Sequence, residues 1–264
     1  MATRLISAGV GLILFALVMF IDKLVLTVSV AIISSIAVYE GLKAYGYNKY
    51  KLFTFIGCII PFIFAFSNYI KNEIVFLILI LIVTLYVAFL LEHHNEFFTK
   101  DFFAVLVITI GIPLSFATLS YIRNMENGKF YVWLPFISSW LTDTFAYFGG
   151  FFFGKKKLCP NISPKKTVEG AVSGVIGAVI GYALYSYLLN NVWGVSVNTL
   201  WFILIAVFTS VTSQMGDLFA SLMKRENGIK DFGNLMPGHG GALDRFDSIL
   251  ITAPFIFILL QFIV

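Results

Sequence analysis

The sequence predicts an all-α, polytopic integral membrane protein with about nine transmembrane helices. Of its 264 residues, 59% are hydrophobic and only 12% are charged. An ordinary soluble domain carries about 25% charged residues. Apolar runs long enough to cross about 30 Å of hydrocarbon as a helix recur from one end of the chain to the other. This composition excludes an ordinary soluble fold.

The expected spans follow one another with short polar connections. The first run has no A-x-A cleavage site and leads directly into the second, so we expect a retained span and not a removed signal. An odd number of spans places the two termini on opposite sides of the membrane. In chain order the expected spans are 5–21, 24–41, 52–70, 74–91, 102–121, 130–153, 168–189, 199–216 and 246–264.

The distribution of basic residues predicts the orientation. With loops assigned alternately to the two sides, all but four of the 18 basic residues fall on one face, the exceptions being Lys23, Lys71, Arg123 and Lys129. The positive-inside rule makes the richer face cytoplasmic. We therefore expect a cytoplasmic N-terminus and a C-terminus on the opposite side. The compact length favours a bacterial inner membrane.

Polar residues divide the chain into two regions. Residues 1–130 hold about five spans and few features beyond them, so we interpret them as a scaffold. Residues 131–264 form the expected catalytic region, with cytoplasmic loops at 154–170 and 217–245. The seventh span carries glycines spaced i, i+4, i+7 and i+11 on one face, which lets another helix approach closely. These glycines, which could serve a homodimer as well as packing within the chain, are Gly170, Gly174, Gly177 and Gly181.

The end of the eighth span is the first candidate for chemistry. Asp217 lies there within Q-M-G-D. If the helix continues, Ser221, Lys224 and Arg225 follow at i+4, i+7 and i+8 and project to the same side. A charged side chain at the centre of a membrane helix costs about 2.5 to 3.5 kcal/mol. A hydrophobic chain that gathers charges here is therefore expected to use them.

Two further aspartates begin the ninth span. Asp244 and Asp247 lie three residues apart and share a face if the region is helical. With Asp217 they form a trio of acids, and like charges about 4 Å apart repel by about 4 kcal/mol at an effective dielectric of about 20. A bound cation relieves this repulsion, and all-oxygen ligands favour Mg²⁺, with room for a second cation. Salt bridges to the neighbouring lysine and arginines are the competing interpretation.

Between these acids lies the glycine-rich segment G-N-L-M-P-G-H-G-G, residues 233–241. Glycines such as Gly240 and Gly241 allow turns that point several N–H groups at an anion. His239 could donate to a phosphate oxygen or relay a proton. The segment is therefore a candidate phosphate-binding loop.

The basic loop 154–170 is a second candidate anion site. We interpret Ser163-Pro164 as a turn, with Ser163 or Thr167 capping the next helix. Lys165 and Lys166 then lie beside a helix N-terminus, a favourable place for phosphate. The preceding lysines could instead hold anionic lipid head groups. Asp143, inside the sixth span, is a candidate functional acid because charges within spans are costly.

One stretch reads S-L-M-K-R-E-N-G-I-K-D-F-G-N-L-M-P-G-H-G-G-A-L-D-R-F-D, from Ser221 to Asp247. It resembles the signature of the phosphatidate cytidylyltransferases, or CDP-diacylglycerol synthases, in which S-x-x-K-R, K-D-x-G, P-G-H-G-G and D-R-x-D follow in this order. The upstream Q-x-G-D, S-P-x-K-T-x-E-G and D-T-x-A-Y segments also resemble the family. The resemblance covers residues 140–250, and residues 1–130 add only their multi-span character.

The resemblance implies a nucleotidyltransferase that moves the cytidylyl group of CTP to phosphatidate in the bilayer, with Mg²⁺ and without a nucleic-acid partner. It implies a metal site of Asp217, Asp244 and Asp247. The same three acids join a catalytic set with Lys224, Arg225, Lys230, Asp231, His239 and Arg245. The substrate-binding residues that it implies are Asp143, Ser163, Lys165, Lys166, Thr167, Ser221, Gly240 and Gly241.

Two alternatives remain open at this point. A related CTP-dependent transferase could act on an ether lipid or a polyprenol, although such relatives retain only parts of the signature. A transporter also uses acids within the membrane and glycine-broken helices. A transporter is expected to show repeated halves, whereas the charges of this chain gather in one half.

Overall fold

A computed structural model describes residues 2–235 and 240–263, and within them helices predominate and two short strands form one hairpin. The described residues contain five helices that are long and apolar enough to cross a membrane. Their exposed surface is rich in large apolar side chains, such as Phe76 and Leu91, which are 66% and 70% exposed. The chain is therefore an all-α integral membrane protein. The number of nine spans and the direction of the termini stay predictions.

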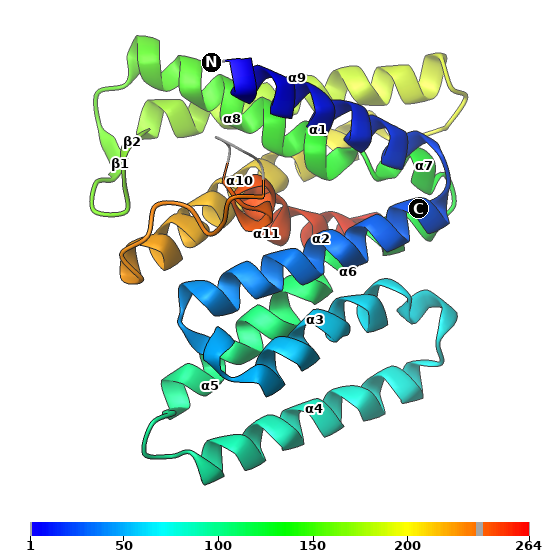
Figure 1. Cartoon of the computed structure of the whole chain (residues 1–264). Coiled ribbons are helices and arrows are strands. Elements are labelled where there is room, and N and C mark those ends of the chain that lie inside the picture. The colour runs from blue at the N-terminus through cyan, green and yellow to red at the C-terminus, as the bar shows by residue number, and fades with distance from the viewer. Residues whose placement is uncertain (1, 236–239, 264) are drawn as a thin grey trace. The chain divides into compact units, whose positions relative to one another are not determined.

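The chain forms two compact units, Met1–Tyr121 with Asp231–Arg245 and Ile122–Lys230 with Phe246–Val264. The helices of the first unit are coloured blue to green in Figure 1, and the last of them ends just beyond it. They are α1 (Ala2–Phe20), α2 (Lys23–Ala44), η1 (Tyr47–Lys49), α3 (Lys51–Ala65), η2 (Ser67–Tyr69), α4 (Asn72–Glu92), α5 (Thr99–Leu106), η3 (Val107–Gly111) and α6 (Ile112–Asn124).

Aromatic packing and one widened turn shape the first unit. The fully buried ring of Phe53 in α3 meets Tyr86 and Phe89 of α4 at centroid distances of 4.9 and 4.5 Å. The segment η3 is a π-helical turn that lies directly before α6. Pro113 explains it, because proline lacks an N–H and its ring clashes with the carbonyl four residues earlier. The apolar run 99–124 therefore continues as one helical stretch with a local bulge.

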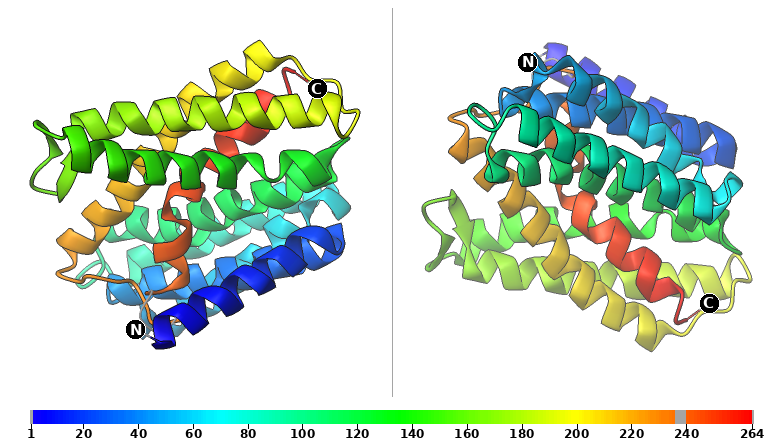
Figure 2. Two further views of the ribbon diagram at one scale, coloured as in Figure 1. Left: turned by 90° about the horizontal axis from the view of Figure 1, so that it is seen from above. Right: turned by 90° about the horizontal axis from the view of Figure 1, so that it is seen from below.

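The second unit contains the hairpin and the long helices around it (Figure 2). Asn198 caps α10, because its side chain accepts hydrogen bonds from the N–H groups of Leu200 and Trp201 at 2.9 and 3.3 Å. The elements are α7 (Gly128–Tyr131), α8 (Leu134–Phe153), β1 (Lys157–Cys159), β2 (Ser163–Thr167), α9 (Val168–Asn191), α10 (Thr199–Glu226) and α11 (Ala242–Leu260), the last of which begins in the first unit.

The glycine face of α9 packs against α8, and the two helices run side by side in Figures 1 and 2. A Cβ at Gly174 would lie 2.9 Å from the carbonyl oxygen of Thr142, and one at Gly170 would lie 2.7 Å from that of Ala146. Both positions therefore need the absence of a side chain. The predicted helix approach is confirmed as packing within the chain, so this face is not available to a second copy.

Buried hydroxyl groups join α8 to α10. Ser138 donates to the hydroxyl of Thr209 at 3.0 Å, and Thr142 donates to that of Ser210 at 2.8 Å. Polar side chains that bond across helices hold membrane proteins together where apolar surface gives no driving force. The contact fixes α10 beside α8 and thereby positions the end of α10.

The structure corrects the interpretation of Ser163-Pro164 as a turn. Both residues lie in β2, which pairs antiparallel with β1. The turn occupies residues 160–162 instead and is closed by a hydrogen bond from the Ile162 N–H to the Cys159 carbonyl at 3.2 Å. Pro160 suits the second position of such a turn, whereas Pro164 needs no partner for its nitrogen in a two-stranded hairpin.

We predict that Gly174→Leu lowers the free energy of unfolding by about 1–3 kcal/mol, the usual cost of forcing extra atoms into a packed interface. Thermal unfolding of the purified protein in detergent measures this change. Val172→Leu is the matched control, because Val172 lies on the same helix and is 56% exposed. Equal unfolding midpoints for the two variants would contradict the packing role of Gly174.

Candidate functional site

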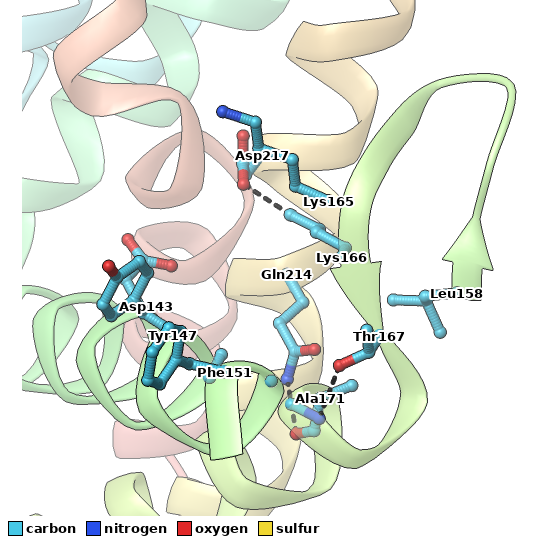
Figure 3. Close-up of a pocket in the computed structure, with 13 residues that line it drawn as sticks. Asp143, Tyr147, Phe151, Leu158, Lys165, Lys166, Thr167, Ala171, Gln214 and Asp217 are labelled. Atoms are coloured by element: carbon cyan, nitrogen blue, oxygen red, sulfur yellow. Dashed lines mark hydrogen bonds and ion pairs between the residues drawn. The ribbon is translucent and has the colours of Figure 1, made fainter. Parts of the chain in front are cut away.

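A pocket of about 400 Å³ opens in the second unit (Figure 3). Its walls come from α8, β1, β2, α9 and α10. Three of the predicted substrate-binding residues in the basic loop, Lys165, Lys166 and Thr167, line it together with Asp143 and Asp217. Ser163 lies at the start of β2, next to the hairpin turn. The remaining lining residues are Ala146, Tyr147, Gly150, Phe151, Leu158, Gly170, Ala171 and Gln214.

An ion pair crosses the pocket. Lys166 Nζ lies 2.5 Å from Asp217 Oδ2, as the dashed line in Figure 3 shows. Both side chains remain partly accessible, with exposed fractions of 25% and 30%. A solvent-accessible pair of this kind contributes about 0–1 kcal/mol to stability. It therefore costs little to exchange Asp217 for another anion at Lys166.

Two contacts hold the basic loop in place. The Thr167 hydroxyl accepts a hydrogen bond from the Gly170 N–H at 3.1 Å and so caps α9, as predicted. Glu169 accepts hydrogen bonds from the N–H groups of Lys155 and Lys156 at 3.0 and 3.2 Å. The loop that carries the lysines is therefore tied at both ends to the start of α9.

Three carboxylates lie within electrostatic range of one another: Asp143 from α8, Asp217 from α10 and Asp247 from α11. Gly216 explains how α11 comes so near, because a Cβ there would lie 2.6 Å from the backbone oxygen of Asp247. The charge of Lys224 acts on Asp247 as well. The second unit thus gathers acids and lysines around the pocket.

The continuation of α10 past Asp217 is confirmed, since the helix ends at Glu226 and not near 216. Hydropathy marks only the apolar part of a helix, whereas Leu, Met, Lys, Arg and Glu continue it because they favour helix. Ser221 and Lys224 are half-buried and Arg225 is exposed. Lys230 and Asp231 are exposed in the segment that follows.

Asp244 belongs to the first unit, where it binds both described parts of the loop that precedes α11, residues 231–235 and 240–241, which we call the signature loop. Its Oδ2 accepts hydrogen bonds from the N–H groups of Phe232 and Gly241 at 2.8 and 3.0 Å. Gly240 has a φ of 85°, which L side chains rarely adopt. Arg245 is exposed, and His239 lies outside the described residues. Asp244 and Asp247 both lie in α11, so the predicted helical spacing of the two is confirmed.

Of the three aspartates predicted to bind metal, the structure places Asp217 and Asp247 near one another in the second unit, whereas Asp244 belongs to the first unit. Asp217 and Asp247 interact within the second unit, and their additional partner there is Asp143. Across residues 2–235 and 240–263, no group of three or more His, Cys, Asp or Glu side chains could hold a metal ion. The donor chemistry still fits a hard cation, because Mg²⁺ is commonly bound by one or two carboxylates together with substrate phosphates.

Sequence reasoning missed three residues that position the site. Glu169 and Gln214 lay within the quoted motifs, but their partners could not be read from them. Gln214 donates to the carbonyl of Ala171 at 3.2 Å and so ties α10 to α9. Gly216 precedes Asp217 in Q-M-G-D, and a glycine next to a functional acid was the available signal for a close backbone approach.

Comparisons with known proteins show the family of the chain. The profile of the cytidylyltransferase family matches residues 2–263. A phosphatidate cytidylyltransferase from Bacillus subtilis is 33% identical over 270 residues, which cover 98% of this chain and 97% of that protein. One from Rickettsia bellii is 36% identical over 170 residues (62% and 73%), and one from Haemophilus influenzae is 39% identical over 153 residues (58% and 53%). The similarity thus extends to residues 1–130.

We predict that Thr167→Val destabilises the protein by about 1 kcal/mol, the usual loss when a helix cap is removed. Valine keeps the shape of threonine but leaves the Gly170 N–H without its acceptor. Thermal unfolding checks this, with Thr144→Val as the control because Thr144 is exposed on α8. Thr167→Ser should behave as the unsubstituted protein, and a loss as large as that of valine would contradict the capping role.

Proposed function

The chain belongs to the cytidylyltransferase family, and we propose that CTP meets phosphatidate at the pocket of the second unit. The protein is a phosphatidate cytidylyltransferase, which converts CTP and phosphatidate into CDP-diacylglycerol and diphosphate for phospholipid synthesis. The observation that supports the site is the Lys166–Asp217 pair in a pocket with two further acids near it.

The reaction needs no nucleophile from the protein. A phosphate oxygen of phosphatidate attacks the α-phosphorus of CTP, a new P–O bond forms, and the bond to the β-phosphate breaks to release diphosphate. The enzyme has to align two polyanions and stabilise the charge of the transition state. Lysines beside a capped helix N-terminus and acids that can hold a cation meet these two needs.

Lys166 is the proposed first contact for phosphate. In the structure its ammonium group pairs with Asp217, so the positive charge is already aimed into the pocket. An incoming triphosphate carries more negative charge than one carboxylate and would draw Lys166 away from Asp217. Lys165 lines the same pocket and is exposed, so it can reach a second phosphate. Ser163, Thr167 and Asp143 complete the proposed substrate-binding set.

The carboxylate released from Lys166 gives the proposed cation site. Asp217 and Asp247 would hold Mg²⁺ there, with Asp244 as the third predicted ligand and Asp143 as an additional acid. When bound, Mg²⁺ neutralises the phosphates and orients them for in-line displacement. A second cation fits the same acidic surroundings.

The remaining signature residues are assigned to the phosphates and the departing diphosphate. Ser221 and Lys224 follow Asp217 by about one and two turns of α10, and we propose that they extend the site beyond the residues that line the pocket. Gly240 and Gly241 of the glycine-rich loop are proposed to contact the substrate. The Gly241 N–H is bonded to Asp244, so the N–H offered to substrate would be that of Gly240. The proposed catalytic set, beyond the three metal-ligand aspartates, is Lys224, Arg225, Lys230, Asp231, His239 and Arg245.

The lipid is proposed to enter sideways from the bilayer. Tyr147 and Phe151 line the pocket and are 69% and 72% exposed, so an aromatic surface adjoins the charged one. Acyl chains can stay in hydrocarbon while the phosphate reaches Lys166. We further propose nine spans, a cytoplasmic N-terminus and a pocket on the cytoplasmic side of a bacterial inner membrane. A homodimer would use a surface other than the glycine face of α9.

We predict that purified protein transfers label from cytidine-labelled CTP to phosphatidate only when a divalent cation is present. Label should enter the organic phase with Mg²⁺, disappear with EDTA and return when Mg²⁺ is restored. Replacing phosphatidate by a polyprenol or an ether-lipid acceptor tests the related transferases. Label that never enters lipid under any of these conditions would rule out the proposed reaction.

We predict that Asp217→Asn and Asp244→Asn each lower kcat by about 100-fold or more, because a bound cation supplies several kcal/mol of charge stabilisation. Asparagine keeps an oxygen acceptor for the N–H groups that Asp244 binds, so the loop should stay folded. Glu226→Gln, an exposed acid on α10, is the control and should stay active. Near-normal activity of either aspartate variant removes that residue from the site.

A further inference from the structure

Glu40 is a buried acid that connects α2 to the signature loop within the first unit. Its side chain is only 5% exposed. Oε1 accepts a hydrogen bond from the Ala242 N–H at 3.1 Å, and Oε2 accepts one from the Leu243 N–H at 2.9 Å. These are the first two residues of α11, separated from Glu40 by about 200 positions in the sequence. One carboxylate thus binds the start of the helix that carries Asp244 and Asp247.

The loop is shaped around this carboxylate. A Cβ on either Gly233 or Gly241 would collide with the carboxylate of Glu40. Asp244 binds the N–H groups of Phe232 and Gly241 on the same loop. Two acids therefore hold three consecutive N–H groups, at residues 241–243, together with that of Phe232. Gly233 and Gly241 leave the space that Glu40 fills.

A buried acid in a membrane helix is expensive unless its charge is used. The Glu40 carboxylate accepts hydrogen bonds from N–H groups of the first turn of α11, which have no acceptor within the helix. The positive end of the helix dipole also favours a carboxylate at this position. Glutamine could accept only one of the two hydrogen bonds, because its NH₂ group would face an N–H donor. The geometry therefore requires glutamate specifically.

We propose that Glu40 is a positioning residue for cytidylyl transfer, which sets the conformation of the signature loop and the start of α11 without touching substrate. This rests on the proposed role of that loop and of Asp244 in the reaction. Residues 1–130 then help to shape the signature loop and are more than a scaffold in the membrane.

The test compares Glu40→Gln with Glu92→Gln, an exposed acid at the end of α4 in the same unit. In Glu40→Gln, kcat should fall about 10- to 100-fold, the range for residues that orient functional groups. The KM for phosphatidate should change little, and amide hydrogen exchange of residues 241–243 should rise. The unfolding midpoint should fall no further than in Thr167→Val, which also loses one helix-cap hydrogen bond. Glu92→Gln should match the unsubstituted protein in every measurement. Glu40→Asp, too short to keep both bonds, gives a second variant if Glu40→Gln folds poorly.

A double-mutant cycle separates this role from general destabilisation. Gly233→Ala should lower kcat when Glu40 is present, because the methyl group displaces the carboxylate. In the Glu40→Ala background the same substitution should cost almost nothing more, whereas independent losses would add. Unchanged kcat in Glu40→Gln together with an inactive Asp244→Asn overturns this inference alone. Unchanged kcat in both variants removes the loop from the reaction and overturns the site assignment too.

Discussion

The close approach of α8 and α9 is the constraint on which the pocket depends. Two backbone surfaces meet where Gly170 and Gly174 carry no side chain. The approach brings Asp143 on α8 opposite Lys166 and Thr167, which precede α9. Hydroxyl contacts then place α10 against α8, and Asp217 follows from its position along α10. A helix pair set further apart would leave these charged groups without a common cavity.

The carboxylates of this protein divide into two kinds by what they bind. Glu169 and Asp244 accept hydrogen bonds from backbone N–H groups and hold loops in place. Asp143 and Asp217 instead lie near one another and near Lys166, and Asp247, which also accepts a hydrogen bond from the Ser248 N–H at 2.7 Å, lies within electrostatic range of both. Acids of the first kind already accept hydrogen bonds from the backbone, and the metal role proposed for Asp244 would add to that contact. The negative charges of Asp143, Asp217 and Asp247 repel one another, and the proposed cation would reduce this repulsion.

Much of the architecture could be predicted from the sequence, because a run of about 20 apolar residues identifies a membrane-spanning helix. The cap at Thr167, the glycine face and the continuation of α10 also follow from local rules. Contacts between distant segments could not be predicted in this way. Nothing local shows that Glu40 binds residues 242 and 243. The rule that singled out Asp143, an acid inside an apolar span, applies equally to Glu40 and was the signal available for it.

The position of the hairpin turn was predicted wrongly, because it also depends on contacts between separate segments. Ser163-Pro164 has the composition of a turn, but Pro160 lies at the turn that forms. Only the pairing of β1 with β2 decides between the two prolines, and pairing is a property of both strands. Likewise, Asp143 joined the acids of α10 and α11 through packing that no motif spacing encodes.

The hairpin between α8 and α9 also bears on how the protein is made. These two helices are neighbours both in sequence and in space, so their contacts close only a short stretch of chain. Local contacts of this kind form fast, whereas contacts between remote segments must wait for a large loop to close. During synthesis the lysine-bearing wall of the cavity can therefore assemble as soon as α9 emerges. The carboxylates of α10 and α11 arrive later, so on the proposed assignment the lysines of the hairpin would be in place before the cation site is complete.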